Sequence, residues 1–587
     1  MFESIQSMID DMTNSKVDIS NANIYDEFKL PIQYLENDVY KIDDNIATDL
    51  EIDFCDASGH ISNTMYDHLF LPEDVFDTKC IIRNDIYTTN VEFLQETQQV
   101  IKNMETFNEN DCSKIDSQQI LEVWKETKQN PWFLDKYCYI DWKIFRHFNE
   151  SHIFLQVLSF MNMSSPFLAL IVPLLFLIFP FLILKLQGIP ISFSTYVNTL
   201  KLIAKDHFIG KMLNIQNLKI ETVLYVFFSI GFYCMQIYQN VNICMRFYNN
   251  LSNINNHLLN TRTYIERTLH KTDLFLKLNQ DLTYYKEFNH DVLRYSDSLR
   301  ELQQMLKSVQ FEPSIFKITE VGYLLKVFYI LHSNIEYQKA IQYSVGFNGY
   351  INNLKAILCH VENQAVNFAT FSKKKTVFKN QYYPPLHNEE QVVKNDTLVN
   401  KSIITGPNAS GKTTSLKTTM LNIIFTQQYG VGFYSHCVLQ PYHYIHSYLN
   451  IPDTSGRDSL FQAEARRCKQ IIDLIEDNSS KRHFVIFDEL FSGTNPVEAS
   501  KSAYAFLLYL SKYENVDFIL TTHYTSICKK LEKRSKIKNY KMNVLVDGNK
   551  LSYTYKMTKG VSKVQGALIV LEEMNFPNEI IDCIKKY

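Results

Sequence analysis

The feature that most limits how this chain can fold is a short loop near position 410 that is bounded by two glycines. Residues 405–414 read Thr-Gly-Pro-Asn-Ala-Ser-Gly-Lys-Thr-Thr, the G-x-x-x-x-G-K-[ST] spacing of a phosphate-binding loop. The apolar pair Ile403-Ile404 before it indicates a strand, and the stretch from Ser415 to Phe425 favours a helix. Glycines let backbone N–H groups turn toward an anion, and a helix N-terminus adds partial positive charge. The sequence therefore predicts a strand–loop–helix unit that binds a nucleotide phosphate; a chance match in a glycine-bearing turn is the alternative.

Two side chains of this loop are expected to carry chemistry. Lys412 is placed to reach the β- and γ-phosphates of ATP, and the hydroxyl of Thr413 is placed to hold Mg²⁺. The remaining expected nucleotide-binding residues of the loop are Gly406, Pro407, Asn408, Ala409, Ser410, Gly411 and Thr414.

Two downstream strands end in polar residues suited to ATP hydrolysis. The apolar run 483–487 ends in Asp488, expected to hold Mg²⁺ through water, and in Glu489, expected to polarise the attacking water. The run 516–522 ends in His523, where a sensor of the γ-phosphate belongs in a parallel sheet. A strand that ends in surface acids and a histidine that belongs to the core are the alternatives. The candidate catalytic residues are Lys412, Glu489 and His523.

A serine turn lies between these two parts of the sequence. Gly456-Arg457-Asp458-Ser459 runs into a predicted helix, and a helix N-terminus with a serine hydroxyl offers donors for a second phosphate-facing surface. The order of phosphate loop, serine turn, acidic strand end and histidine is that of ATPases that close as dimers. In such dimers the serine turn of one subunit completes the site of the other.

Several of these motifs together resemble the ATPase domain of the MutS family of DNA mismatch-repair proteins, over residues 370–580. The resemblance implies ATP and Mg²⁺ in composite dimer sites, Ser459 acting in trans, His523 beside the nucleotide, and a nucleotide-controlled clamp on DNA. It also implies a homodimer or a MutS-like heterodimer. The helices expected over residues 247–370 fit the core and lever helices of the family. The motifs are Ile404 to Asn408 leading into Gly411-Lys412-Thr413, Ser459-x-Phe461-x-x-Glu464, Asp488-Glu489 with Ser492-Gly493-Thr494, Thr522-His523-Tyr524, and Tyr555 to Ala567.

The sequence also departs from that family. Ala409-Ser410 stands where the mismatch-repair branch usually has Met-Gly, and Leu460 stands where that branch has threonine. These departures indicate a divergent branch.

Charge is distributed unevenly over the 587 residues. Residues 1–150 carry 30 acidic and 12 basic side chains, whereas residues 371–587 carry 20 acidic and 29 basic ones. We therefore expect the acidic N-terminal region, whose fold and role the sequence does not indicate, to bind a basic protein, and the C-terminal region to favour nucleic acid. The 11 cysteines form no C-x-x-C pair, so neither a zinc site nor a disulfide framework is predicted.

Two apolar runs predict a membrane hairpin. Residues 166–184 contain no charged or strongly polar side chain, and as a helix they would span roughly 28 Å, close to the hydrocarbon thickness of a bilayer. Residues 222–245 contain no charge, although Gln236 and Asn240 are among the polar residues of the last third. The connection 185–221 is basic, which conflicts with a place across the membrane from the ATP site. Buried helices of a large core are the alternative.

We thus expect a mixed fold of four regions: an acidic region (1–150), a transmembrane hairpin (151–246), a helical core and lever region (247–370) and an α/β P-loop ATPase domain (371–587). The expected function is that of a membrane-anchored, MutS-like ATP hydrolase facing the cytosol, whose dimeric clamp binds mismatched, damaged or branched DNA. The alternative is a mechanochemical ATPase that acts on a membrane or a protein complex without recognising DNA.

Overall fold

The chain folds into a mixture of helices and sheets. The computed structural model describes residues 24–52, 64–73, 76–77, 85–107, 117–188, 192–204, 220–309, 320–387, 389, 391–449, 451, 459–535, 537–547, 550–564, 568, 571–572, 574 and 576–586. The chain divides into two compact units. We call them the helical unit (Met1–Ile24, Lys114–Leu269, Ser296–Ile341) and the sheet unit (Tyr25–Ser113, His270–Tyr295, Gln342–Tyr587).

The centre of the sheet unit is a largely parallel sheet. Among the described residues its strand order is β13-β12-β6-β11-β10-β9, and only β13, at one edge, runs antiparallel to its neighbour. Asp488 pairs with Thr521 and Thr521 with Ile404, so the carboxyl ends of β10, β11 and β6 meet at one edge of the sheet. The strands are β6 (Ser402–Thr405), β9 (Tyr444–Tyr448), β10 (His483–Asp488), β11 (Val516–Thr521), β12 (Lys538–Asp547) and β13 (Lys550–Lys559).

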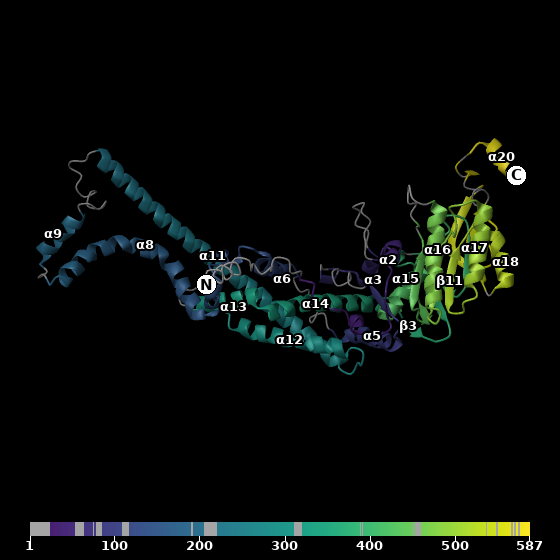
Figure 1. The fold of residues 1–587 in the computed structure, drawn as a ribbon, viewed down its shortest axis with the longest axis horizontal. Helices are drawn as coiled ribbons and strands as arrows, with labels where there is room; N and C mark the ends of the chain where they lie inside the picture. Colours follow the sequence, from purple (N-terminus) through teal and green to yellow (C-terminus); the bar gives the residue numbers. More distant parts are fainter. Residues whose placement is uncertain are drawn as a thin grey trace, which may run out of the picture. The chain divides into compact units, whose positions relative to one another are not determined.

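Helices surround this sheet (Figure 1), which explains why its inner strands are apolar runs rather than alternating patterns. One face packs in a single core with α16 (Leu460–Asp477), α17 (Pro496–Leu510) and α18 (Thr525–Arg534). Helix α15 (Lys412–Tyr429), which contacts β10 and β11, follows the loop after β6, so the predicted strand, loop and helix are confirmed at this position.

A second sheet stands beside the first. Its strand order among the described residues is β5-β4-β8-β3-β7, with β3 and β8 parallel and the other pairs antiparallel. The strands are β3 (Asn367–Phe371), β4 (Thr376–Gln381), β5 (Asn395–Val399), β7 (Val431–Gly432) and β8 (His436–Leu439), and η8 (Pro384–Leu386) lies between β4 and β5.

Part of the acidic N-terminal region belongs to the sheet unit and covers the end of α15. The Tyr66 hydroxyl hydrogen-bonds the amide of Gln428, and the Gln427 amide donates to the carbonyl of Thr88. Three acidic side chains of this segment pair within the chain: Asp49 accepts from Ser447 at 2.6 Å, Glu51 lies 3.6 Å from Lys417, and Asp43 lies 3.9 Å from Arg467. The elements are η2 (Pro31–Tyr34), β1 (Val39–Lys41), α2 (Asp44–Asp49), α3 (Met65–Phe70), β2 (Ile86–Thr88), α5 (Val91–Asn103) and η3 (Met104–Thr106), with β1 and β2 antiparallel.

One buried glutamine of α5 fixes the end of α15. The Nε2 atom of Gln98 donates to the carbonyl oxygens of Gly430 at 2.7 Å and Ala369 at 2.8 Å. Replacing Gln98 with leucine removes both bonds, and we expect the free energy of unfolding to fall by about 1–3 kcal/mol because two carbonyls in a buried place each lose one donor; the Gly430 carbonyl keeps the N–H of Ala369. Urea unfolding followed by circular dichroism measures the change. Gln99→Leu, at an exposed position of the same helix, is the matched control and should change stability by less than about 0.5 kcal/mol; equal effects of the two variants would contradict this role of Gln98.

The helical unit is built around an aromatic core. Phe133 stacks on Tyr139 and on His332, and the Tyr139 hydroxyl donates to the carbonyl of Leu325 at 2.7 Å. Gly322 lets two helices touch, because a Cβ there would lie 2.3 Å from the carbonyl oxygen of His152. The elements are α6 (Ser117–Trp124), η4 (Lys125–Gln129), α7 (Phe133–Lys136), η5 (Lys143–Glu150), α8 (His152–Leu186), α9 (Phe193–Ala204) and α13 (Val321–Ser333), together with parts of α11 (Ile220–Asn279), α12 (Lys286–Lys307) and α14 (Ile335–Glu362).

The prediction of a transmembrane hairpin, and with it the membrane localisation, is wrong. In the part of the chain that the structure describes, no helix combines the length and the apolar character needed to cross a membrane. The apolar runs 166–184 and 222–245 are segments of the longer helices α8 and α11, which continue to Leu155 and Ile254, both fully buried in the helical unit. The length of an apolar run does not by itself distinguish a membrane-spanning helix from an apolar segment of a longer helix that packs in a protein core. Much of the basic connection, residues 189–191 and 205–219, lies outside the described residues.

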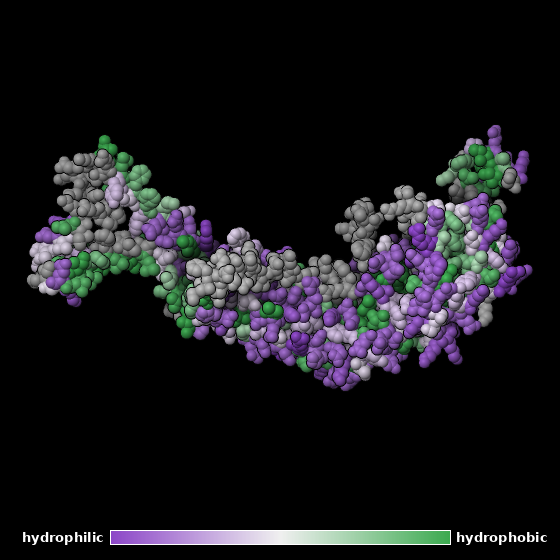
Figure 2. Space-filling model, in the orientation of Figure 1, coloured by the Kyte–Doolittle hydropathy of each residue, from purple (hydrophilic) through white to green (hydrophobic). Residues whose placement is uncertain are grey.

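Hydrophobic side chains nevertheless remain exposed on these two helices. Figure 2 shows hydrophobic residues along α8 and the first part of α11. They include Phe167 and Phe179 in α8 and Phe227 and Phe232 in α11.

Candidate functional site

The loop between β6 and α15 has a tightly folded backbone with two residues at positive φ. Gly411 caps α15 at φ 90°, and Ala409 has φ 60°, a left-handed conformation that costs a residue with a Cβ about 1–2 kcal/mol. Gly406 has no room for a side chain, because a Cβ would lie 2.7 Å from the Oγ of Ser410. The Ser410 hydroxyl donates to the carbonyl of Pro407 at 2.8 Å, which closes the loop on itself.

Lys412 lies folded back on this loop. Its side chain is buried, and Nζ donates to the carbonyl oxygens of Gly406 and Pro407, each at 3.1 Å. Nζ also lies 3.2 Å from the Nε2 of His523. Burial lowers the pKa of Lys412, and the nearby carboxylates of Glu489 and Asp488 oppose this shift. The amine is thus held at the carboxyl end of the sheet by groups that a phosphate could replace.

Oxygen ligands suited to a divalent cation meet beside the lysine. The Thr413 hydroxyl donates to Oδ2 of Asp488 at 2.7 Å, and the Thr521 hydroxyl donates to the other carboxylate oxygen. A hydroxyl and a carboxylate side by side fit Mg²⁺, which prefers oxygen ligands and retains several of its waters. Thr413 and Asp488, predicted to share a metal, are therefore in direct contact.

Glu489 and His523 are in hydrogen-bonding contact at the ends of β10 and β11. The Nε2 of His523 lies 2.9 Å from an oxygen of Glu489, and this hydrogen bond lowers the pKa of the carboxyl group, although partial burial opposes the shift. Glu489 has φ 49°, so the strand turns sharply at this residue. Its backbone N–H donates to Thr521, and that of Thr522 donates to Ile404, which aligns the three strand ends.

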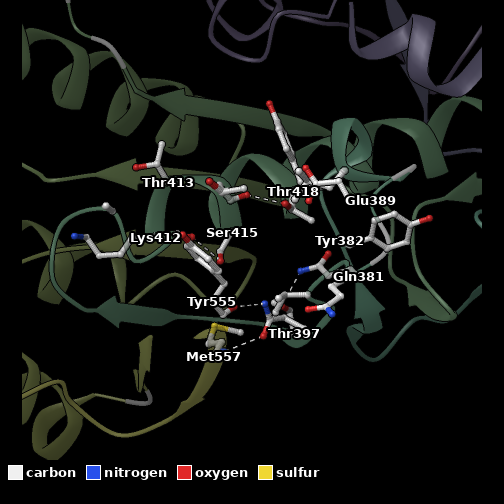
Figure 3. A pocket seen from close by; sticks show the side chains of 18 of the residues that line it. Gln381, Tyr382, Glu389, Thr397, Lys412, Thr413, Ser415, Thr418, Tyr555 and Met557 are labelled. Atoms are coloured by element: carbon white, nitrogen blue, oxygen red, sulfur yellow. Dashed lines mark hydrogen bonds between the residues drawn. The ribbon is translucent and has the colours of Figure 1, made fainter. Parts of the chain in front are cut away.

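A cavity of about 710 Å³ opens beside the loop and is lined by Asn408, Lys412, Thr413 and Glu489 among others. Figure 3 shows Lys412, Thr413 and Ser415 on one side and, on the other, Gln381 and Thr397 of the second sheet and Tyr382, which follows β4. The second sheet's contribution was not predicted from the sequence. The strands of this sheet carry no spacing motif. The only sequence signal nearby is the tyrosine and proline cluster 382–385, whose aromatic rings are of the kind that line binding cavities.

Tyr555 of β13 also lines this cavity and lies against the loop, because a Cβ on Gly411 would be 3.2 Å from its ring. Tyr555 has φ 55°, and Asn395 holds the distorted strand by donating to the carbonyl of Tyr555 and accepting from the N–H of Met557. The sequence placed Tyr555 in a motif but gave it no role.

Ser459 does not line this cavity, and neither do Gly406, Pro407, Ser410, Asp488 and His523 among the predicted site residues. It caps α16: its Oγ accepts from the N–H of Gln462, whose side chain accepts from the N–H of Ser459. Gly456, Arg457 and Asp458, the rest of the predicted turn, lie outside the described residues. Within one chain the structure therefore brings together Lys412, Thr413, Asp488, Glu489 and His523.

Residues 402–587 match the family model of MutS domain V. Proteins named endonuclease MutS2 are among the relatives to which the chain is similar. The one from Staphylococcus haemolyticus (strain JCSC1435) is 30% identical over 220 residues, which are 37% of this chain and 28% of that protein. The one from Staphylococcus aureus is 30% identical over 219 residues, 37% of this chain and 30% of that protein. The chain thus spans less than a third of the length of these relatives. The findings support the MutS family for the C-terminal region and give no support to a membrane-anchored branch of it.

Proposed function

We propose that this chain is an ATP hydrolase of MutS type that works as a dimer and uses ATP and Mg²⁺ to control its binding to DNA. The observation that carries the proposal is the cluster at the carboxyl ends of β6, β10 and β11. There a lysine, a threonine–aspartate pair and a glutamate–histidine pair lie around a loop that folds for phosphate. In a region that matches MutS domain V, this set of groups has the composition of an ATP-hydrolysing site.

Each side chain has a role in this proposal. The backbone N–H groups of residues 408–413 and the N-terminus of α15 bind the phosphates, and Lys412 exchanges its two loop carbonyls for phosphate oxygens. Thr413 and Asp488 would hold Mg²⁺, which when bound neutralises charge on the phosphate oxygens. Glu489 accepts the proton of the attacking water, and His523 orients the carboxylate through its hydrogen bond.

The remainder of the cavity is assigned to the nucleoside. The volume of about 710 Å³ exceeds what the phosphates need, and the wall away from the loop contains Tyr382, Leu386 and Val393. Apolar and aromatic walls of this kind suit a base, and Tyr555 lies at the junction between the wall and the loop.

A dimer is supported by the match to MutS domain V and by the place of Ser459. Ser459 is exposed at the start of a helix of 18 residues, which leaves it accessible to a partner subunit. DNA as a partner is supported by the excess of basic residues in 371–587 and by the mismatch-repair family to which the C-terminal region is similar.

The proposal is tested by measuring the ATPase rate of the purified full chain with and without duplex, mismatched and branched DNA over a range of salt concentrations. We expect DNA to change the rate and the effect to weaken steeply as salt increases, because phosphate contacts release counterions. An ATPase that does not respond to any of these DNAs would favour the alternative, an ATPase that acts on a protein complex. The acidic charge of residues 1–150 would then be the reason to look for a basic protein partner.

A further inference from the structure

The loop that carries Glu489 has an unfavourable backbone. We call residues 489–494, which follow β10, the base loop. Both Glu489, at φ 49°, and Phe491, at φ 60°, are in the left-handed region, which side chains with a Cβ rarely adopt. Strain of this kind persists only where the surroundings hold the backbone in place.

A single buried carboxylate holds the base loop. Glu464 of α16 is 2% exposed. One of its oxygens accepts from the backbone N–H of Ser492 at 3.0 Å and from its hydroxyl at 2.9 Å, and the other accepts from the N–H of Gly493 at 3.2 Å. The hydroxyl of Tyr448 accepts from the N–H of Phe491 at 3.3 Å.

The base loop also packs closely on the first turn of α16. A Cβ on Gly493 would lie 2.7 Å from the Cγ of Leu460 and 2.9 Å from the backbone nitrogen of Phe461. The rings of Phe461 and Phe491 are 5.7 Å apart. The contact therefore requires glycine at position 493, and a shift of α16 would move the base loop with it.

Helix α16 begins at the residue assigned to the partner's site. Ser459 is its N-cap, and the reciprocal bonds with Gln462 make the first turn a rigid piece. Glu464 lies one turn further along the same helix. The Glu464 side chain thus joins, by hydrogen bonds, the helix that carries Ser459 to the loop that carries Glu489.

We propose that Glu464 is a positioning residue that couples the two composite ATP sites of the dimer. Contact between Ser459 and the partner's nucleotide is transmitted through the first turn of α16 and the Glu464 carboxylate to Glu489 in the chain's own site. The base is therefore aligned for hydrolysis only when the other site is occupied. This inference rests on the proposed function, namely an ATPase dimer with Ser459 acting in trans.

The first test replaces Glu464 with glutamine. An amide has one oxygen, so in either orientation its NH₂ group faces an N–H of the base loop. We expect kcat to fall about tenfold or more because the base is displaced, while the affinity for ATP stays within about threefold. Ser492→Ala, which removes one of the three bonds, should lower kcat in the same direction but less. Asp473→Asn, at an exposed ion pair on the same helix, is the matched control and should leave kcat unchanged.

The second test separates the coupling from the direct action of Ser459. In a mixed dimer the first subunit carries Glu489→Gln, so ATP is hydrolysed only in the site that contains Glu489 of the second subunit. The first subunit keeps its Ser459 and completes that site. Placing Ser459→Ala in the subunit with the intact base should lower turnover at least about fivefold if the sites are coupled. With Glu464→Gln added to that subunit, Ser459→Ala should have no further effect.

Two results would overturn the coupling: a Glu464→Gln protein with unchanged kcat, and a mixed dimer in which Ser459→Ala leaves turnover unchanged. Loss of ATP binding in Glu464→Gln would also overturn it, because Glu464 would then support the whole site rather than position the base. A wild-type chain that fails to dimerise or to hydrolyse ATP contradicts the proposed function instead, so the two failures are distinguishable.

Discussion

Replacing Glu489 with glutamine is expected to leave ATP bound and to stop its turnover. Glutamine keeps the shape of the side chain and can still hydrogen-bond His523, but it does not accept a proton from water. Removing a general base typically costs a factor of about 10²–10⁴ in rate. Equilibrium binding of labelled ATP and single-turnover hydrolysis measure the two parts separately.

The matched control for this variant is Glu498→Gln, an exposed glutamate in the first turn of α17. It should hydrolyse ATP at the wild-type rate. Hydrolysis that continues unchanged in Glu489→Gln would remove the assignment of Glu489 as the base.

The pH dependence of the ATPase rate is a second test of the role of Glu489. The hydrogen bond with His523 lowers the pKa of Glu489, so the carboxylate stays ionised, and able to accept a proton, down to a lower pH than an ordinary glutamate. Activity is therefore present above this pKa and is lost as the pH falls through it. Replacing His523 with alanine should move that acidic limb to higher pH.

Replacing Lys412 with alanine is expected to abolish ATP binding. The buried amine donates to two loop carbonyls and lies beside His523, so the variant loses both the charge that faces the phosphates and a tie that shapes the loop. Charge-assisted hydrogen bonds contribute about 1.5–3 kcal/mol each, so we expect affinity to fall by two orders of magnitude or more. Calorimetric titration with ATP measures the loss.

Lys417→Ala tests whether any lysine of α15 would give this result. Lys417 lies further along the same helix and pairs with Glu51. The variant should bind ATP with wild-type affinity. Wild-type affinity in Lys412→Ala would contradict the placement of the phosphates at this loop.

The parts of the site that sequence reasoning predicted are those fixed by short-range chemistry. A phosphate-binding loop needs glycines and a lysine at set spacing, and the strand ends at Asp488 and His523 follow apolar runs that form buried strands. Parallel pairing then brings these ends together, as the registers of β6, β10 and β11 confirm. The spaced motifs contain Glu464 and, separately, Ser492 and Gly493, but their spacing does not indicate that they meet, so the link between Glu464 and the base loop was not predicted.

The membrane prediction failed for a related reason. An apolar run of 19 residues is long enough to span a bilayer, but its length says nothing about the neighbours that a helix has. Whether α8 and α11 end with their apolar runs or continue into a packed helical unit depends on contacts with residues such as those of α13, far away in the sequence.

By itself, then, the sequence determined the strand, glycine-bounded loop and helix around Lys412, the acidic and histidine strand ends and the helix that follows Ser459, because each depends on residues within a few positions of one another. Only the tertiary structure decided that residues 25–107 belong with the sheet unit, that the second sheet and Tyr555 complete the cavity, and that Glu464 holds the base loop. These features depend on side chains that meet across tens to hundreds of residues, where burial and hydrogen bonding choose the partner and local propensity has no influence.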